Sequence, residues 1–303
     1  MFNETPVYTS LAQALTSIAG NDASISGTER VSGGDINKSY SLTLSSGRKI
    51  FMKANEKDNA PFFAAEALGI SAIASTSTVS TPAILCTGTE KGEQVGYSFL
   101  FMDFIESASP ATNYWEIFAE ELASMHKASV KDFSNKKFGF IQNNFIGSRK
   151  QINTPSDSWI EFFRDRRLVP QFKDADHYFD DGLKNKITKL LDHLDEFLIE
   201  PESPSLLHGD LWAGNVMCGP DGKAWLIDPA VYSGHAEADI AMTELFGGFP
   251  AEFYETYKSV SPLQNGYEER RDIYNLYHLL NHLNMFGASY LNPVRSIVSE
   301  YTD

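Results

Sequence analysis

Strand-like patterns of apolar and polar residues fill the N-terminal third of the chain. Three segments separated by Gly- and Ser-containing turns have the composition of strands: around Arg30–Val31, Ser39–Leu44 and Lys49–Ala54. A helical stretch follows at 60–74, and the run Y-S-F-L-F-M at 97–102 has the composition of a buried strand. These segments predict an antiparallel meander, followed by a helix and a further strand.

From about residue 114 onward, apolar residues recur at the spacing of amphipathic helices. The first of these helices places Ile117, Phe118 and Leu122 on one face, and His126 near its end is interpreted as a structural residue. Further helices are predicted at 8–19, 156–169, 183–198, 233–242, 251–257 and 268–290. The pattern therefore changes from strand-rich to helix-rich near residue 114.

The most specific stretch lies at 206–232, where H-G-D-L-W-A-G-N precedes an apolar run that ends in Asp228. His208, Asp210 and Asn215 match the pattern H-x-D-L-x-x-x-N, in which the aspartate accepts the proton of the attacking hydroxyl and the asparagine holds a metal ion. A carboxylate at a strand end, here Asp228, is the second group expected to hold that metal. The stretch predicts phosphoryl transfer, with Asp210 as catalytic base and Asn215 and Asp228 as metal ligands. His208 is interpreted as a hydrogen-bond partner of the loop backbone.

Two charged residues upstream extend this arrangement. Lys53 lies in the apolar strand I-F-M-K-A, and Glu66 follows thirteen residues later in the helical stretch 60–74. In kinases, a lysine on the third strand pairs with a glutamate on the next helix and orients the α- and β-phosphates. Either residue alone would be interpreted as a solvated surface charge. Their order upstream of 206–232 predicts that Lys53 and Glu66 bind the nucleotide.

Two further segments are candidates for nucleotide contacts. The turn S-G-G-D contains Gly33 and Gly34, whose backbone N–H groups could approach a phosphate, although an ordinary hairpin turn explains it equally well. The chain lacks the Walker-type pattern G-x-x-x-x-G-K-[ST]. The expected hinge, whose backbone would bind the adenine edge, comprises Asp103, Phe104, Ile105 and Glu106. A plain loop after a central strand is also compatible with these hinge residues.

The composition excludes several functional classes. The chain has 303 residues, 42% of them hydrophobic and 13% aromatic, as expected for a globular protein. Its net charge of −15 and pI of about 4.9 argue against a nucleic-acid or anionic-membrane binder. Two distant cysteines, Cys86 and Cys218, indicate neither a disulfide framework nor a zinc site. With no run of about 18 apolar residues and no leader-like N-terminus, we expect a cytoplasmic protein that binds no membrane.

Two segments, H-G-D-L-W-A-G-N and I-D-P-A-V-Y-S-G-H-A-E-A-D-I-A-M, resemble the fructosamine kinase (ketosamine 3-kinase) family. This family is a branch of the protein-kinase-like superfamily that also contains aminoglycoside phosphotransferases and choline kinases. H-G-D in place of H-R-D, and D-P-A in place of D-F-G, distinguish it from eukaryotic protein kinases. The likeness covers nearly the whole chain. It implies an α+β, protein-kinase-like two-lobed fold, with an antiparallel sheet and helix in a nucleotide-binding lobe at 1–104 and a mainly helical catalytic and substrate-binding lobe at 105–303.

The resemblance also implies the reaction and its partners. ATP with Mg²⁺ would phosphorylate a sugar hydroxyl of a ketosamine, a fructosamine or ribulosamine on a protein or small amine, and the unstable product would break down and release the amine. Trp212, His235 and Glu237 are candidates for substrate contacts, and Trp212 is compatible with either sugar stacking or packing. Asp239 is interpreted as a helix-borne brace of the catalytic loop. The oligomeric state is left open, with a monomer slightly favoured.

Two alternatives stay open at this point. One is a kinase of the same fold that acts on another small hydroxyl compound, such as an aminoglycoside, choline or methylthioribose. The other is a non-catalytic pseudokinase that acts as a binding protein. A pseudokinase would be expected to lack at least one of four residues, all of which are present: Lys53, Asp210, Asn215 and Asp228.

Overall fold

The computed structural model describes residues 4–32, 37–92 and 96–303, and the chain divides into two compact units. The first unit comprises Met1–Phe118 and Val216–Pro229, and the second comprises Ala119–Asn215 and Ala230–Asp303. The lobe boundary expected at residue 104 lies inside the first unit. The segment Val216–Pro229, expected in the C-terminal lobe, also belongs to the first unit. No helix among the described residues is both long and apolar enough to cross a membrane.

A six-stranded sheet forms the centre of the first unit, in the order β1-β5-β6-β4-β3-β2. The strands are β1 (Val7–Tyr8), β2 (Ile25–Val31), β3 (Lys38–Leu44), β4 (Lys49–Glu56), β5 (Ile84–Glu90) and β6 (Tyr97–Asp103). All neighbouring strands are antiparallel except β1 and β5, which run parallel. The predicted meander corresponds to β2, β3 and β4. The short β1 and the strand β5 were not predicted.

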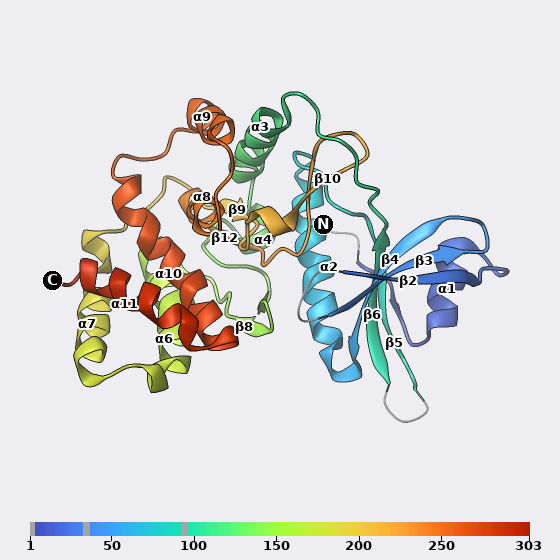
Figure 1. The fold of residues 1–303 in the computed structure, drawn as a ribbon, viewed down its shortest axis with the longest axis horizontal. Coiled ribbons are helices and arrows are strands. Elements are labelled where there is room, and N and C mark those ends of the chain that lie inside the picture. The colour runs from blue at the N-terminus through green and yellow to red at the C-terminus, as the bar shows by residue number, and fades with distance from the viewer. Residues whose placement is uncertain (1–3, 33–36, 93–95) are drawn as a thin grey trace. The chain divides into compact units, whose positions relative to one another are not determined.

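Helices α1 (Leu11–Ala19) and α2 (Ala60–Ser75) pack on opposite faces of this sheet (Figure 1). Side chains alternate between the faces of a strand, so Ile50, Met52 and Ala54 of β4 belong to the core on the α1 side. Phe51 lies with the core on the α2 side, which contains Phe63 of that helix. Lys53, between Met52 and Ala54, shares the face of Phe51. This alternation directs Lys53 toward α2.

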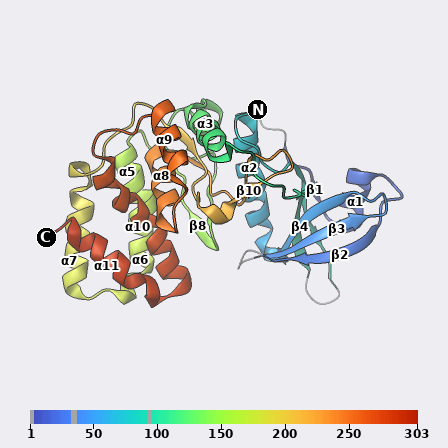
Figure 2. The same ribbon diagram turned by 45° about the horizontal axis from the view of Figure 1, so that its top comes forward.

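The second unit is mainly helical (Figure 2). Its longest helix, α10 (Tyr267–Phe286), is largely buried and packs against α6 (Val169–Asp174), α8 (Ala236–Leu245) and α11 (Leu291–Glu300). The remaining helices are α4 (Lys131–Ser134), α5 (Trp159–Phe163), α7 (Asp181–Asp192) and α9 (Ala251–Val260), while α3 (Tyr114–Lys127) crosses the boundary between the units. The helix expected at 156–169 is interrupted by a π-helical turn at Arg164–Leu168.

Three two-stranded ladders flank the loops that carry the predicted catalytic residues. In the second unit, β9 (Ser205–Leu207) pairs with β12 (Tyr232–Gly234), and β7 (Asn144–Ile146) pairs with β8 (Arg149–Gln151). In the first unit, β10 (Val216–Cys218) pairs with β11 (Ala224–Leu226), the predicted apolar run before Asp228. The helix expected from residue 233 begins only at Ala236, because residues 232–234 pair with β9.

Candidate active site

Lys53 forms the centre of a charged cluster in the first unit. Its Nζ donates a hydrogen bond to Glu66 Oε1 at 2.6 Å and also contacts Asp228 Oδ1. Lys53 is buried on β4, and Glu66 reaches it from α2, the helix packed on the same face of the sheet. The pairing predicted between Lys53 and Glu66 is therefore present, and Asp228 joins it from a segment 175 residues away in the chain.

The charges of this cluster perturb one another. Burial alone would lower the pKa of Lys53, but the neighbouring carboxylates of Asp228 and Glu66 hold it above its ordinary value. Burial raises the pKa of Glu66, and the Lys53 ammonium opposes this shift. Lys53 consequently stays protonated, so the cluster offers a fixed positive charge beside two carboxylates.

Asp228 occupies a strained position two residues after the end of β11. Its φ angle is +54°, in the left-handed region that non-glycine residues rarely adopt. The hairpin that leads to it is tied to the rest of the first unit, because Leu226 N donates to Ser80 O at 2.9 Å. Such backbone strain is common where a side chain must be aimed for function. The geometry thus places the Asp228 carboxylate at a defined end of the hairpin, with 40% of its side chain exposed.

The expected hinge follows β6 directly. Asp103 ends that strand and accepts a hydrogen bond from Arg48 at 2.9 Å, and Lys49 Nζ lies 5.4 Å from the centre of the Phe104 ring. The backbone groups of Phe104, Ile105 and Glu106 make no hydrogen bond to another described residue. These backbone groups are available for the edge-on recognition that the hinge interpretation requires. Gly33 and Gly34, the two glycines expected to approach a phosphate, lie outside the described residues.

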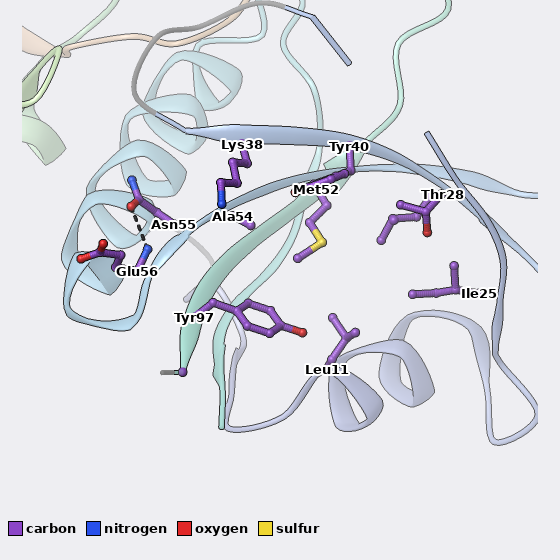
Figure 3. Close-up of a pocket in the computed structure, with 12 residues that line it drawn as sticks. Leu11, Ile25, Thr28, Lys38, Tyr40, Met52, Ala54, Asn55, Glu56 and Tyr97 are labelled. Carbon is purple, nitrogen blue, oxygen red and sulfur yellow. Dashed lines mark hydrogen bonds between the residues drawn. The ribbon is translucent and has the colours of Figure 1, made fainter. Parts of the chain in front are cut away.

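A cavity of about 530 Å³ lies on the other face of the same sheet, between α1 and strands β2, β3 and β4 (Figure 3). Met52 and Ala54 line it, whereas Lys53 between them contacts Glu66 on α2. The sheet therefore separates this cavity from the charged cluster. Figure 3 shows its lining, which includes Leu11, Ile25, Tyr40 and Tyr97.

In the second unit, the predicted catalytic loop has a defined conformation. Asn215 Nδ2 donates to the Asp210 carbonyl at 2.8 Å and to Asp210 Oδ2 at 3.2 Å. Asn215 is buried, and with its amide nitrogen engaged, its Oδ1 is the atom left to accept a cation. His208 is fully buried, and its Nδ1 accepts a hydrogen bond from Asp210 N at 3.3 Å. The structure confirms the backbone role predicted for His208.

Asp239 holds this loop from α8. Its two carboxylate oxygens accept hydrogen bonds from His208 N at 2.7 Å and Gly209 N at 2.9 Å. His126 Nε2 lies 3.2 Å from Asp239 Oδ2, and His126 Nδ1 lies 2.7 Å from the Tyr257 hydroxyl. Burial would raise the pKa of Asp239, but hydrogen bonds and the nearby histidines hold it below its ordinary value. The bracing role of Asp239 and the structural role of His126 are confirmed.

Gly209 explains why this loop reads H-G-D. Its φ angle is +79°, and a Cβ atom at this position would lie 2.2 Å from the Ala230 carbonyl oxygen. Ala230 N in turn donates to His208 O at 2.9 Å. The loop and the segment at Ala230 therefore approach too closely for any side chain between them.

Comparisons with known proteins agree with this geometry. The family model for fructosamine kinase matches residues 7–303. The probable ketoamine kinase of Synechocystis is 36% identical over 303 residues, which cover 98% of each chain. The chloroplastic protein-ribulosamine 3-kinase of Arabidopsis thaliana is 40% identical over 277 residues, or 89% of this chain and 81% of that protein. A candidate fructosamine-3-kinase from Haemophilus somnus, solved by crystallography, superposes with a TM-score of 0.84 at 29% identity, covering 97% of both chains.

The chain belongs to the fructosamine kinase family. It is therefore an ATP-dependent phosphotransferase that acts on a hydroxyl group of a ketosamine, and its fold is of the predicted protein-kinase-like class. This match covers almost the whole chain. It supports neither of the two alternatives, a kinase for another small hydroxyl compound or a pseudokinase.

Trp212 of the kinase lies two residues after Asp210 and is 39% exposed. Its ring covers Gly214, where a Cβ atom would lie 2.3 Å from the indole. The Phe246 ring meets it edge-on, with centroids 6.3 Å apart. Trp212 is thus supported from two sides, while more than a third of it remains open to a ligand.

His235 and Glu237 of the kinase are placed differently. Glu237 is 1% exposed and forms a two-pronged ion pair with Arg270, at 2.9 and 2.7 Å. His235 caps α8, and its Nε2 lies 3.0 Å from Gln264 Oε1. Burial lowers the pKa of His235. Both side chains therefore have protein partners that tie α8 to α10 and to the segment before it.

Three residues that support the site were not predicted. Asn144 Nδ2 donates to Val231 O at 2.8 Å, and Gln151 Nε2 donates to Ala230 O at 2.9 Å. Tyr277 on α10 completes this network by donating to Gln151 Oε1 at 2.7 Å. The pair Asn143 and Asn144 is visible in the sequence, but no local pattern indicates partners about 80 residues away.

Proposed function

We propose that Asp210 is the base that accepts the proton of the sugar hydroxyl as its oxygen attacks the γ-phosphorus of ATP. The new bond joins the sugar oxygen to phosphorus, the bond to the β–γ bridging oxygen breaks, and ADP leaves. Asn215 holds Asp210 through its backbone and side chain, and Asp239 holds the two residues before it. Phosphoryl transfer depends mainly on such alignment, so an aspartate of ordinary basicity suffices.

The observation that carries the proposal is the Lys53 ammonium held between Glu66 and Asp228. Lys53 contacts two carboxyl groups, that of Glu66 inside the cluster and that of Asp228 at its partly exposed edge. A structural ion pair would need only one carboxylate, so the partly exposed Asp228 is surplus to such a pair. The surplus fits a nucleotide site in which Lys53 meets the α- and β-phosphates, Glu66 orients Lys53, and Asp228 faces a metal ion.

Asn215 and Asp228 are the residues that would hold Mg²⁺. Both provide the oxygen ligands that Mg²⁺ prefers, the Asn215 amide being oriented by Asp210. The described residues contain no group of three His, Cys, Asp or Glu side chains that could hold a metal by themselves. This agrees with an ion bound by few protein groups together with substrate phosphates. Bound Mg²⁺ would neutralise charge that develops on the transferred phosphoryl group.

For the acceptor, we propose a fructosamine or ribulosamine carried by a protein or a small amine. The Arabidopsis relative, 40% identical to this chain, is a protein-ribulosamine 3-kinase. Trp212 would contact the sugar or its amine through its exposed face. The ion pair between Glu237 and Arg270 and the burial of His235 favour structural roles for these two residues in place of the substrate contacts expected from the sequence. The adenine edge would meet the backbone of the hinge at 104–106.

The test measures ADP release with ribulosamine- and fructosamine-modified lysine and with an aminoglycoside panel. Asp210→Asn should lower kcat on the order of 10³-fold, because Asn cannot accept the proton. The exposed Asp195→Asn should match the wild type in kcat. Unchanged turnover in Asp210→Asn would rule out its role as base. Turnover of aminoglycosides without turnover of any ketosamine would overturn the proposed acceptor.

A further inference from the structure

Trp212 is the first of five aromatic side chains that contact one another in sequence in the second unit. The Phe246 ring centre lies 6.3 Å from Trp212 and 4.8 Å from His282. The His282 ring centre lies 5.4 Å from Phe286 and 5.0 Å from Tyr290, which are 6.4 Å from each other. We call these five residues the aromatic strip. In the sequence it begins two residues after Asp210, and its last members lie at the end of α10 and in the turn that follows.

Exposure distinguishes the strip from the rest of the surface. Six large apolar side chains among the described residues are exposed, and the only aromatic ones are Trp212 and Phe286, the latter at 50%. Both belong to the strip, at its two ends. The others are the aliphatic residues Val7, Ile141, Val169 and Val260. Single exposed aliphatic residues are common, whereas Trp212 and Phe286 are joined through the partly buried rings of Phe246 and His282. Contiguous apolar surface of this kind is a feature of binding sites.

The strip is uncharged at neutral pH, although it contains a histidine. His282 Nδ1 donates to the His278 carbonyl oxygen at 2.8 Å, and burial lowers the pKa of His282. A neutral imidazole does not repel a cation. Aromatic faces attract ammonium groups and also cover aliphatic carbons. The strip therefore suits a ligand that combines alkyl chains with positive charge.

Secondary structure fixes the outer rings. Phe286 is the last residue of α10, and Tyr290 ends the 3₁₀ turn Ala288–Tyr290. Gly287 between them has a φ of +91°, and its N–H donates to Leu283 O at 3.0 Å. The sharp change of direction at Gly287 brings the two rings onto His282. A preformed surface of this kind loses little conformational entropy when it binds.

We propose that Phe246, Phe286 and Tyr290 form the binding surface for the carrier of the ketosamine, namely a polypeptide segment around the glycated lysine. This inference rests on the proposed function of Asp210 and Trp212. With the sugar hydroxyl at Asp210 and the sugar or its amine at Trp212, the lysine chain leads outward, and the remaining rings of the strip are the apolar surface continuous with Trp212. The net charge of −15 favours encounter with lysine-rich segments.

The experiment compares two ketosamine substrates: ribulosamine on a small alkylamine, and ribulosamine on a lysine within a peptide. For Phe286→Ala and Tyr290→Ala, we expect KM for the peptide to rise about tenfold, the equivalent of about 1.4 kcal/mol. Their kcat values and their KM for the small substrate should stay within about twofold of wild type. Val260→Ala, which removes an exposed apolar side chain outside the strip, serves as the matched control.

Three results would overturn the inference. These are equal KM changes for both substrates, no change for either, or a wild-type enzyme that phosphorylates only the small ketosamine. Phe286→Leu keeps the apolar bulk but loses the ring face, and it should give an intermediate KM for the peptide. This variant keeps the test valid if the alanine variant does not fold. A wild type that phosphorylates neither ketosamine would refute the proposed function itself, which separates that failure from failure of the strip.

Discussion

Lys53 on β4 and Glu66 on α2 form a buried ion pair with 2.6 Å between Nζ and Oε1. Because Lys53 also contacts Asp228, its position depends on two carboxylates from separate segments. Removing one partner of a buried ion pair leaves the other charge uncompensated and commonly costs about 3–5 kcal/mol. Since Asp228 remains beside Lys53, the loss of Glu66 should affect the free energy of unfolding less than it affects kcat/KM for ATP.

We predict that Glu66→Gln lowers kcat/KM for ATP by up to about 100-fold, because Lys53 is then aimed by Asp228 alone and small misplacements are costly. The free energy of unfolding should fall by about 1–3 kcal/mol. Steady-state kinetics and urea denaturation measure the two effects. Glu56 is exposed at the end of β4, the strand that carries Lys53, and serves as the control. Glu56→Gln should change neither the kinetics with ATP nor the free energy of unfolding. If Glu66→Gln retained wild-type kinetics with ATP, the orienting role of Glu66 would be wrong.

The order of the chemical residues could be predicted from the sequence because each carries a local signature. Lys53 lies in an apolar strand, Glu66 follows on a helix, and Asp210 and Asn215 are five residues apart within one loop. The structure confirms the contact of Lys53 with Glu66, and it adds a contact of Asn215 with Asp210 that was not predicted. These local signatures survive because strands and helices have fixed side-chain periods.

Contacts between distant segments could not be predicted in the same way. Glu237 was a candidate for substrate contacts because its neighbours resemble a known segment. In the structure it is hydrogen-bonded to Gln264 and Arg270, which lie 27 and 33 residues further along the chain. Likewise, nothing near Asn144 indicates that it holds the backbone of Val231. Composition and spacing along a chain do not specify which distant groups satisfy a buried polar side chain. Such pairs arise only when the whole unit is packed.

Asp239 is predicted to be essential for the shape of the catalytic loop. Asp239→Asn keeps the size of the side chain but can accept only one of the two backbone N–H groups, so the free energy of unfolding should fall by about 1–3 kcal/mol. We expect kcat to fall on the order of 100-fold as Asp210 loses its alignment. Asp181→Asn, in the first turn of α7, is the control and should retain activity.

The pH dependence of stability provides a second check on Asp239. Its folded-state pKa lies below the ordinary 3.8, so its contribution is present above that value and is lost as pH falls through the folded pKa. The stability difference between wild type and Asp239→Asn should therefore shrink below about pH 4. A difference that stayed constant down to pH 3 in urea titrations would contradict the lowered pKa of Asp239.

Gly209→Ala should disrupt the same loop by a steric route. The left-handed backbone alone costs about 1–3 kcal/mol for a non-glycine residue, and the new Cβ would lie 2.2 Å from the Ala230 carbonyl oxygen. Gly47 has a φ of +85° with nothing within 4 Å of its Cβ position, so Gly47→Ala isolates the backbone cost. We expect a clearly larger loss of stability and of kcat in Gly209→Ala. Equal losses in the two variants, measured by urea denaturation, would show that the close approach to Ala230 is unimportant.

His278 on α10 should make stability depend on pH between about 3 and 6.5. Burial and the neighbouring His282 lower the pKa of His278 to about 3, and its Nδ1 is buried without a partner among the described residues. The unfolded chain binds this proton below pH 6.5 while the folded chain does not, so acidification destabilises the fold by up to about 1.4 kcal/mol per pH unit. We predict that His278→Phe removes the contribution of one proton from the slope of stability against pH, and that it keeps or raises stability at pH 7. Tyr274→Phe, on the same helix, is the control and should leave this slope unchanged. Urea titrations at pH 4, 5, 6 and 7 measure the slope directly, and an unchanged slope in His278→Phe would mean that this histidine is protonated in the folded protein.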